Sequence, residues 1–478
     1  MSTFSIVLRI LLCAVFAYAI GSVSFAVIFS KAFAHRDVRE MVEDIGERWA
    51  DRYAYSFRLN PRDKEVVRKT YPELRDEIRA LSMAFINHGF AGKHITLIGK
   101  YSYNWVLTYY ASMCTASVLI PLDKDWTAAD LTATAQRADT EVLIVDKSIE
   151  AKGREIAEAL GLELLITETD VTELVEEGRP LFEQNSAPYY ETEIDPRAMA
   201  LLVFTSGTTG KGKGVMLCQG GITWDLADVV QYIDFSKKTI GVLPPHHTYC
   251  SSVSIYGQNS VGIEVYISSG LSAISKEIQE QKPGHIVLVP LYVETFYRKI
   301  QSSLEKQGKT KLVYRMIKVS NFLRKLGIDL RKKLFGKITE AFGGNLDHLV
   351  CGGAAINQDI IDFFDGIGIT ILNGYGITEC APLISANYPG ENRVGSVGKP
   401  VAYMDVRIDN GEIVVIKYGG IGLFDQNDAA VGLHDKAFPA QIHAGGNEKN
   451  NKCSNKRTYF FDDIFKFHDL TSLLDYYR

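Results

Sequence analysis

The chain has 478 residues, of which 46% are hydrophobic and 23% are charged, enough for about three globular domains of ~150 residues with a large core. Its net charge of -5 gives no sign of a nucleic-acid partner, and we expect none. The seven cysteines are scattered and form no CxxC pair, so we expect reduced thiols rather than a zinc site or a disulfide framework.

The first segment is strongly apolar. Residues Phe4 to Phe29 are interrupted only by Arg9 and small polar residues, and the run is long enough to cross a bilayer. Basic residues follow it, so the positive-inside rule predicts a membrane-anchored chain (membrane helix within 1–38) whose main body is cytoplasmic. A buried amphipathic or surface helix is the alternative. The first forty residues also resemble the first membrane helix of the acyl-phosphate-using glycerol-3-phosphate acyltransferases, but none of that family's later membrane helices follows, so no acyltransferase activity is implied.

From about Arg39 the pattern alternates between helical and strand-like segments. The spacing predicts helices over Glu40–Tyr53, Tyr71–Asn87, Asn104–Ala116 and Ala128–Ala138, and strands over His94–Ile98, Ser117–Pro121 and Glu141–Val145. This is a βαβ series, which predicts a parallel sheet covered by helices.

A phosphate-binding loop is predicted after the apolar run Leu201–Phe204, which reads as a buried strand. Thr205 to Gly214 contains only Gly, Ser, Thr and Lys, so its backbone can approach an anion closely while hydroxyl and ammonium groups donate to it. The spacing from Gly207 to Lys213 satisfies Walker A, but Gly214 follows where a magnesium-binding hydroxyl is required. A Gly/Thr-rich linker is the remaining alternative.

The ten residues TSGTTGKGKG resemble the signature of the adenylate-forming (AMP-binding) superfamily, whose loop runs TSGTTGxPKG; Gly212 replaces the usual proline. The segments Asn104-Trp105 and Ile120–Asp123 also resemble the start of such enzymes. The resemblance implies ATP as a substrate, bound by Thr205, Ser206, Gly207, Thr208, Thr209, Gly210 and Lys213.

The segment Gly241–Tyr249 reads as a strand that ends in a sharp polar turn with two histidines, His246 and His247. A metal site is disfavoured because no third ligand lies at a usable spacing. In the resembled family this position faces the carboxylate substrate, which implies that role for His247 and a structural role for His246. A histidine without a catalytic role is the alternative for either.

Residues 301–342 form a long, basic stretch of helical character, preceded by a strand and a helix with Pro290 in its first turn. The stretch resembles an insertion that separates long-chain fatty acyl-CoA synthetases from short-chain relatives. A basic amphipathic surface would suit an enzyme that takes its substrate from an anionic membrane, and membrane lipids are therefore an expected partner. An ordinary solvated helical face is the alternative.

Two further strand ends carry the rest of the predicted site. His348–Cys351 leads into Gly352-Gly353-Ala354-Ala355, and Ile369–Leu372 leads into Asn373-Gly374-Tyr375-Gly376-Ile377-Thr378-Glu379. The resemblance implies that Tyr375 stacks on adenine, Thr378 donates to the α-phosphate and Glu379 holds Mg²⁺. It also implies that the nucleotide contacts Gly353, Ala354, Ala355, Asn373, Gly374 and Gly376. A tight turn with a buried tyrosine is the alternative.

The family pattern continues through Gly395–Pro400 and a predicted strand pair, Asp405–Ile408 and Gly411–Ile416. After Lys417 neither the family's ribose-binding aspartate nor its small domain with a catalytic lysine can be recognised. We therefore expect an adenylation domain over 39–416 and an irregular tail over 417–478.

Together these observations predict an α/β fold, the large N-terminal domain of an adenylate-forming enzyme, with two stacked αβαβα-type subdomains and a partial β subdomain. The implied function is ATP-dependent activation of a fatty acid to acyl-AMP and then acyl-CoA, with CoA as acceptor, impaired by the atypical tail. Catalytic roles fall to Thr205, Lys213, His247, Thr378 and Glu379. A non-catalytic, membrane-tethered nucleotide- or acyl-binding remnant is the alternative.

Overall fold

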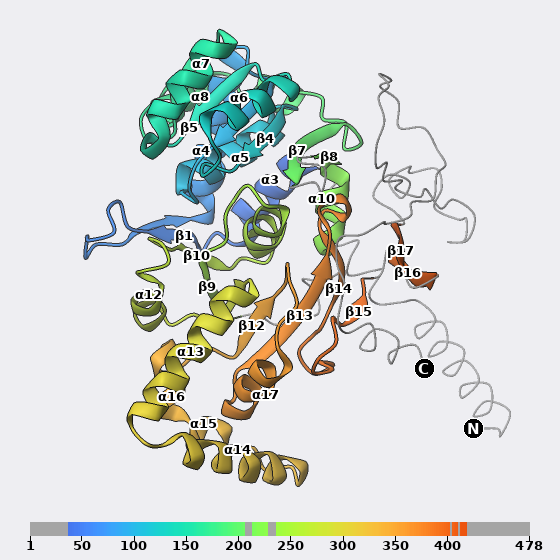
Figure 1. Cartoon of the computed structure of the whole chain (residues 1–478). Helices are drawn as coiled ribbons and strands as arrows, with labels where there is room; N and C mark the ends of the chain where they lie inside the picture. The colour runs from blue at the N-terminus through green and yellow to red at the C-terminus, as the bar shows by residue number, and fades with distance from the viewer. Residues whose placement is uncertain (1–36, 206–212, 228–235, 402–403, 410–411, 418–478) are drawn as a thin grey trace, which may run out of the picture.

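The computed structural model describes residues 37–205, 213–227, 236–401, 404–409 and 412–417, which form a mixed α/β body (Figure 1). The predicted membrane helix and the tail lie outside these residues. Among the residues that are described, no helix is long and apolar enough to cross a membrane.

The first layer is a six-stranded sheet in the order β6-β5-β3-β4-β7-β8. Its neighbours pair in parallel except for the edge strand β8, which is antiparallel to β7. The strands are β3 (His94–Ile98), β4 (Val118–Leu122), β5 (Val142–Val145), β6 (Leu164–Ile166), β7 (Met199–Thr205) and β8 (Lys213–Cys218).

Helices cover both faces of this sheet. One core contains residues of α4 (Tyr71–Asn87), α5 (Tyr103–Cys114) and α8 (Asp170–Gln184), and the other contains residues of α6 (Ala128–Arg137) and α7 (Glu150–Leu160). The longest of them, α4, begins with a capping box in which the Thr70 hydroxyl accepts from Glu73 N while the Glu73 carboxylate accepts from Thr70 N.

The second layer contains a four-stranded sheet, β2-β1-β10-β9, and a five-stranded sheet, β11-β12-β13-β14-β15. They continue one another, because β9 lies beside β11 and Thr239 Oγ1 donates to His285 O over 2.9 Å. The strands are β1 (Tyr53–Phe57), β2 (Val67–Thr70), β9 (Lys238–Gly241), β10 (Glu264–Ile267), β11 (His285–Leu288), β12 (His348–Cys351), β13 (Thr370–Gly376), β14 (Leu383–Ala386) and β15 (Lys399–Pro400).

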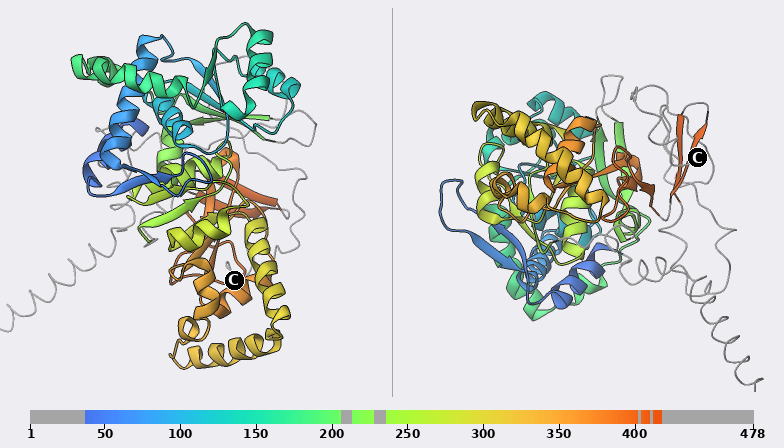
Figure 2. Two further views of the ribbon diagram at one scale, coloured as in Figure 1. Left: turned by 90° about the vertical axis from the view of Figure 1, so that its left-hand side faces the viewer. Right: turned by 90° about the horizontal axis from the view of Figure 1, so that it is seen from below.

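The remaining elements pack around or between these sheets (Figures 1 and 2). A separate hairpin is formed by β16 (Met404–Asp409) and β17 (Glu412–Lys417). The helices are α3 (Val38–Arg48), α9 (Ala187–Glu191), α10 (Gln219–Ala227), the π-helix η3 (Tyr249–Gly257), α11 (Gln258–Ser260), α12 (Ile274–Gln281), α13 (Pro290–Lys306), α14 (Thr310–Lys325), α15 (Arg331–Leu334), α16 (Gly336–Thr339), α17 (Gln358–Ile367), and the 3₁₀ turns η1 (Lys147–Ile149), η4 (Glu340–Phe342) and η5 (Thr378–Cys380).

Two expectations need correction. The predicted helix over 40–53 ends at Arg48, and Tyr53 begins β1, a strand that pairs with β10 far along the chain. The sheets are mixed rather than purely parallel, because β2, β8, β14 and β15 run antiparallel to their neighbours. The basic stretch over 301–342 is helical, as expected, and consists of the end of α13 followed by α14, α15, α16 and η4.

Candidate functional site

The predicted site segments follow strands that end at one edge of the second layer. β11, β12 and β13 pair in parallel, and β9 lies beside β11 in the same direction. The chain therefore emerges at this edge into Val242–His247, Gly352–Ala355 and the end of β13. The carboxyl edge of parallel strands is where open α/β sheets bind ligands.

The predicted phosphate loop connects two paired strands of the first layer. β7 and β8 form an antiparallel pair in which Thr205 lies opposite Lys213. The predicted residues between them, Ser206, Gly207, Thr208, Thr209 and Gly210, lie outside the described residues. A strand, β8, follows this segment. A Walker A loop is followed by a helix whose N-terminus binds the phosphates, so the predicted loop is of a different type.

The structure brings this hairpin to the second predicted motif. β8 packs against η5, the turn that contains Thr378 and Glu379. Asp225 of α10, which follows β8 directly, accepts a hydrogen bond from Leu383 N over 2.8 Å. The two motifs, about 170 residues apart in sequence, therefore lie against each other, with Lys213 on the hairpin and Thr378 and Glu379 on the turn.

The role of Asp225 was not predicted from the sequence. The residue is a buried carboxylate in an otherwise largely apolar helix, and that contrast was the available signal. The partner of Asp225 is a backbone group 158 residues away, which no local pattern reveals.

The turn after β13 is held by backbone contacts that require glycine. A Cβ on Gly376 would lie 2.0 Å from Pro382 O, while Ile377 N donates to that same oxygen over 2.8 Å. This closure holds Thr378 and Glu379 half-buried at the end of the strand. The hallmark glycine at this position is therefore explained by the close approach of two backbones.

Tyr375 is half-buried beside a small apolar cluster that includes Cys380, Leu383 and Ile384. Burial raises the pKa of its phenol, with a smaller contribution from Cys380. The predicted stacking of Tyr375 on adenine stays a prediction.

The small residues after β12 lie beside the end of β13. Cys351 pairs with Asn373, so Gly352 and Gly374 occupy neighbouring strand ends. Gly353, Ala354 and Ala355 are exposed, and Gly353 has a φ of +84°, which favours glycine. An open, flat backbone surface of this kind is compatible with a bound base.

Tyr249 is a second residue that the sequence did not indicate. It lies in the π-helix η3, and its hydroxyl is 3.3 Å from the carbonyl oxygens of both Leu288 and Val350, the strands β11 and β12. A Cβ on Gly352 would lie 3.2 Å from its ring. Tyr249 thus links three strand-end segments, and its unusual helix type is one that recurs at functional sites.

His246 and His247 occupy the turn between β9 and η3, with ring centroids 4.2 Å apart. His246 is the more enclosed ring, 3.8 Å from the Asp123 carboxylate at the end of β4. Desolvation, with help from His247, lowers the pKa of His246 to about 4. His247 is exposed overall, yet the surrounding protein still desolvates the imidazole enough to lower its pKa. Both shifts favour the neutral imidazole at pH 7. The contact of His246 with Asp123 links strand ends of the two layers.

The predicted segment Gly395–Pro400 is fixed against β13 by Asn387. The Asn387 amide is buried, and its Nδ2 donates to Ser396 O over 2.7 Å and to Asn373 O over 3.2 Å. A Cβ on Gly398 would lie 1.9 Å from the Ala386 carbonyl carbon. This segment therefore braces the predicted nucleotide edge.

Among the described residues, no three His, Cys, Asp or Glu side chains gather as a metal site. Glu379 is a half-buried carboxylate on the turn where the two motifs meet. Mg²⁺ commonly takes one or two protein carboxylates together with substrate phosphates, so a single glutamate fits that mode of binding.

Residues 42–422 match the family model of AMP-binding enzymes. The chain belongs to this family. The long-chain-fatty-acid–CoA ligase FadD15 of Mycobacterium bovis is 24% identical over 375 residues, covering 72% of this chain and 62% of the ligase. The long-chain-fatty-acid–[acyl-carrier-protein] ligase AEE15 of Arabidopsis thaliana is 24% identical over 431 residues, covering 77% and 59%. The chain thus spans about six tenths of the length of these curated relatives.

Solved structures share the fold of this chain. VinN in complex with L-aspartate superposes with a TM-score of 0.61 at 19% identity, covering 80% of this chain and 88% of VinN. The N-terminal domain of FACL13 from Mycobacterium tuberculosis gives 0.58 at 16% identity, covering 80% and 89%. These matches support the adenylate-forming fold and, at this identity, only the fold.

Proposed function

We propose that this AMP-binding enzyme activates a fatty-acid carboxylate with ATP and passes the acyl group to a thiol, with CoA as the expected acceptor. The observation that carries the proposal is the packing of the Thr205–Lys213 hairpin base against the Thr378–Glu379 turn. The curated relatives named as long-chain fatty-acid ligases support the substrate class.

The chemistry is an exchange of leaving groups. A carboxylate oxygen of the acid attacks the α-phosphorus of ATP, the bond to pyrophosphate breaks, and an acyl-AMP mixed anhydride forms. The thiol sulfur then attacks the acyl carbon, AMP leaves, and the thiol proton is lost to solvent or a base. A carboxylate is a poor electrophile, and the first step gives it a good leaving group.

The protein's contribution would be positioning and charge. Lys213 and the Thr205 and Thr378 hydroxyls would donate to phosphate oxygens, where preorganised donors stabilise charge that develops in the transition state. His247, neutral at pH 7, would face the acid's carboxylate. Bound at Glu379, Mg²⁺ would supply further neutralisation of phosphate charge.

ATP–pyrophosphate exchange, measured with fatty acids of graded chain length, tests the proposal. Lys213→Ala should lower the exchange rate by roughly 10²–10³ because one charge aimed at the phosphates is lost. Lys147→Ala, which removes an exposed lysine elsewhere, is the matched control. Nucleotide binding without exchange for any acid would instead favour the non-catalytic remnant.

The acceptor is tested separately. Residues after 422 lie outside the family match, and residues 417–478 do not resemble the family's small domain, so we expect thioester formation to be slower than acyl-AMP formation. Supplying CoA in one reaction and an acyl carrier protein in another would identify the thiol. Thioester synthesis as fast as exchange would show that the tail supplies what the small domain normally does.

A further inference from the structure

Helix α14 is docked on the body by one of its faces. Val313, Ile317 and Ser320 are buried in the second layer's core. A Cβ on Gly366 of α17 would lie 2.6 Å from Ile317 Cγ2, so the glycine permits a close helix contact. Arg324 at the end of α14 also pairs with Asp365 over 2.8 Å.

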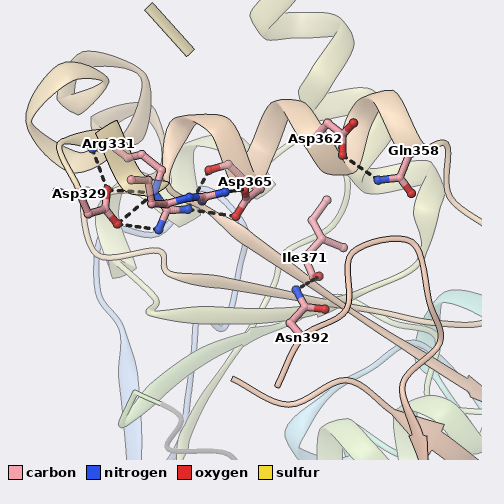
Figure 3. Close-up of polar contacts among 8 residues, drawn as sticks. Asp329, Arg331, Gln358, Asp362, Asp365, Ile371 and Asn392 are labelled. Atoms are coloured by element: carbon pink, nitrogen blue, oxygen red, sulfur yellow. Dashed lines mark hydrogen bonds and ion pairs between the residues drawn. The ribbon is translucent and has the colours of Figure 1, made fainter. Parts of the chain in front are cut away.

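The chain that follows α14 is held at the same point (Figure 3). Arg331 Nη1 lies 3.0 Å from the Asp365 carboxylate and also donates to Asp365 O. A second carboxylate, that of Asp329, binds the same guanidinium. These contacts fix the orientation of α14, so its outer face is a defined surface.

That outer face carries a second apolar stripe. Leu312 and Val319 are each 53% exposed, and Phe322 and Leu326 are each 63% exposed. Their spacing of seven, three and four residues places Leu312, Val319 and Phe322 along one side of the helix, away from the buried side, and Leu326, at the C-cap of α14, continues the line. A stable soluble helix needs one apolar face, and α14 has two.

Positive charge accompanies the stripe. Lys311, Lys318 and Lys325 recur every seven residues and form a row beside the apolar stripe. Arg315 lies within the stripe. Thr310–Lys325 contains no acidic residue. Of the acids near its end, Asp329 and Asp365 are held by Arg331 and Arg324, and Asp347 by Lys332.

The position of α14 leaves this face accessible. In Figures 1 and 2 the helix lies at the end of the body farthest from the six-stranded sheet, along the outside of the second layer. The short helices α15 and α16 beside it add Lys332, Lys333 and Lys337, all exposed.

We propose that the outer face of α14, defined by Leu312, Val319, Phe322 and Leu326 with the lysine row, docks on an anionic lipid membrane. A helix that lies in the membrane interface buries its apolar stripe at the acyl boundary while lysines contact anionic headgroups. The apolar stripe and the lysine row beside it are the two kinds of surface that such a contact requires, and they lie side by side around the helix as it requires.

Other occupants fit less well. A second copy docked through the same face would oppose two helices that both carry only positive charge. The apolar segment Phe4–Phe29 contains Arg9 and no acid, so it offers nothing to pair with the lysines. The proposal stands independently of the ligase activity, because it concerns binding alone.

The test places a reporter on the stripe of the full chain. Phe322→Trp is mixed with vesicles of phosphatidylcholine and phosphatidylserine whose acyl chains are brominated, and tryptophan quenching is measured. Leu271→Trp, at a site 66% exposed between β10 and α12, is the control and shares the same four native tryptophans. We expect extra quenching only at position 322, and only with anionic lipid.

A second arm tests the charge. Changing Lys311, Lys318 and Lys325 to Gln in the Phe322→Trp chain should raise the lipid concentration for half-quenching on the order of 100-fold, since each lysine near an anionic surface is worth about fivefold. Changing the exposed Lys64, Lys147 and Lys237 to Gln is the charge-matched control and should have a small effect.

Three outcomes would overturn the proposal. Equal quenching at positions 322 and 271 would mean that any membrane binding occurs elsewhere, for example through the N-terminal segment. If the reporter tryptophan of the Phe322→Trp chain is already buried without vesicles, and the buried fraction rises with protein concentration, a second copy covers the stripe. If that tryptophan is buried without vesicles at every protein concentration, another segment of the same chain covers the stripe.

Discussion

Two adjacent histidines differ in their surroundings, and this predicts different effects of mutation. His246 is enclosed next to Asp123, whereas His247 is exposed at the predicted carboxylate position. We expect His247→Ala to slow ATP–pyrophosphate exchange, by the roughly 1–3 kcal/mol of a lost polar contact, with little change in the melting temperature. His246→Ala should lower the melting temperature instead. The opposite assignment of the two effects would contradict the predicted roles.

A third histidine predicts acid sensitivity. His285 is fully buried between Gln258 and Ser236, and burial lowers its pKa to about 3 from an ordinary value near 6.5. The unfolded chain therefore binds this proton more readily than the folded one. The stabilising contribution is complete above about pH 6.5 and is lost as the pH falls toward 3, at up to ~1.4 kcal/mol per pH unit.

Urea unfolding between pH 7 and pH 4 measures this effect. His285→Gln retains polar partners but cannot titrate, so its free energy of unfolding should fall less steeply with acidification. His88→Gln, at an exposed histidine, is the control. Parallel pH profiles for the wild type and His285→Gln would contradict the prediction.

At the scale of single residues, sequence patterns located the motif positions but not the residues that brace them. Thr205, Lys213 and Tyr375 lie within short runs whose composition is unusual on its own. Asp225 and Asn387, by contrast, act through backbone groups on other elements. A residue whose partner is supplied by the folded chain leaves no signal in its own neighbourhood.

The contact between α4 and α8 depends on one glycine, and this gives a prediction for an element pair. A Cβ on Gly178 of α8 would lie 1.8 Å from Ala80 O of α4, a backbone atom that cannot rotate away. We expect Gly178→Ala to destabilise the protein by about 1–3 kcal/mol or more through overpacking, as measured by urea unfolding.

The control for this prediction is Gly336→Ala in α16, where a Cβ would meet open space. There alanine should be neutral or stabilise the protein by up to about 1 kcal/mol, because it restricts the unfolded chain. Similar destabilisation by both substitutions would mean that α4 and α8 can move apart.

Elements were predicted where local pattern and tertiary environment agree. β3 and α4 match their predicted bounds, since an apolar run of five and a capped, periodic helix each specify their structure locally. β1 and β2 were missed: the helical spacing of α3 continues in the sequence to Tyr53, and β1 obtains its parallel partner from the distant β10. The antiparallel edge strands were not predicted, because the hydrophobic period of a strand does not determine whether it runs parallel or antiparallel to its neighbour.

At the scale of the whole molecule, the membrane binding of the N-terminal segment and that of the body can be measured separately. α3 begins at Val38, whose backbone N–H donates to Gln219 Oε1, and Asp37 caps the helix. We expect a chain lacking Met1–Lys31 to remain folded, to no longer require detergent for extraction, and to keep salt-sensitive binding to anionic vesicles through α14. Circular dichroism and vesicle sedimentation at two salt concentrations measure these properties. Loss of all vesicle binding would assign the membrane contact to the first 31 residues alone.

The pairing of β1 with β10 has a consequence for how the protein is made. The hydroxyl of Ser56 donates to Glu264, 208 residues later, and the two strands share one sheet. On the ribosome β1 therefore emerges long before its partner exists, and closing so long a loop is slow. β1 can pair early with β2, but its other edge stays without its partner β10 through a large part of synthesis. We expect the nascent chain to be protected by chaperones during that interval and to complete the second layer only once β10 has left the exit tunnel.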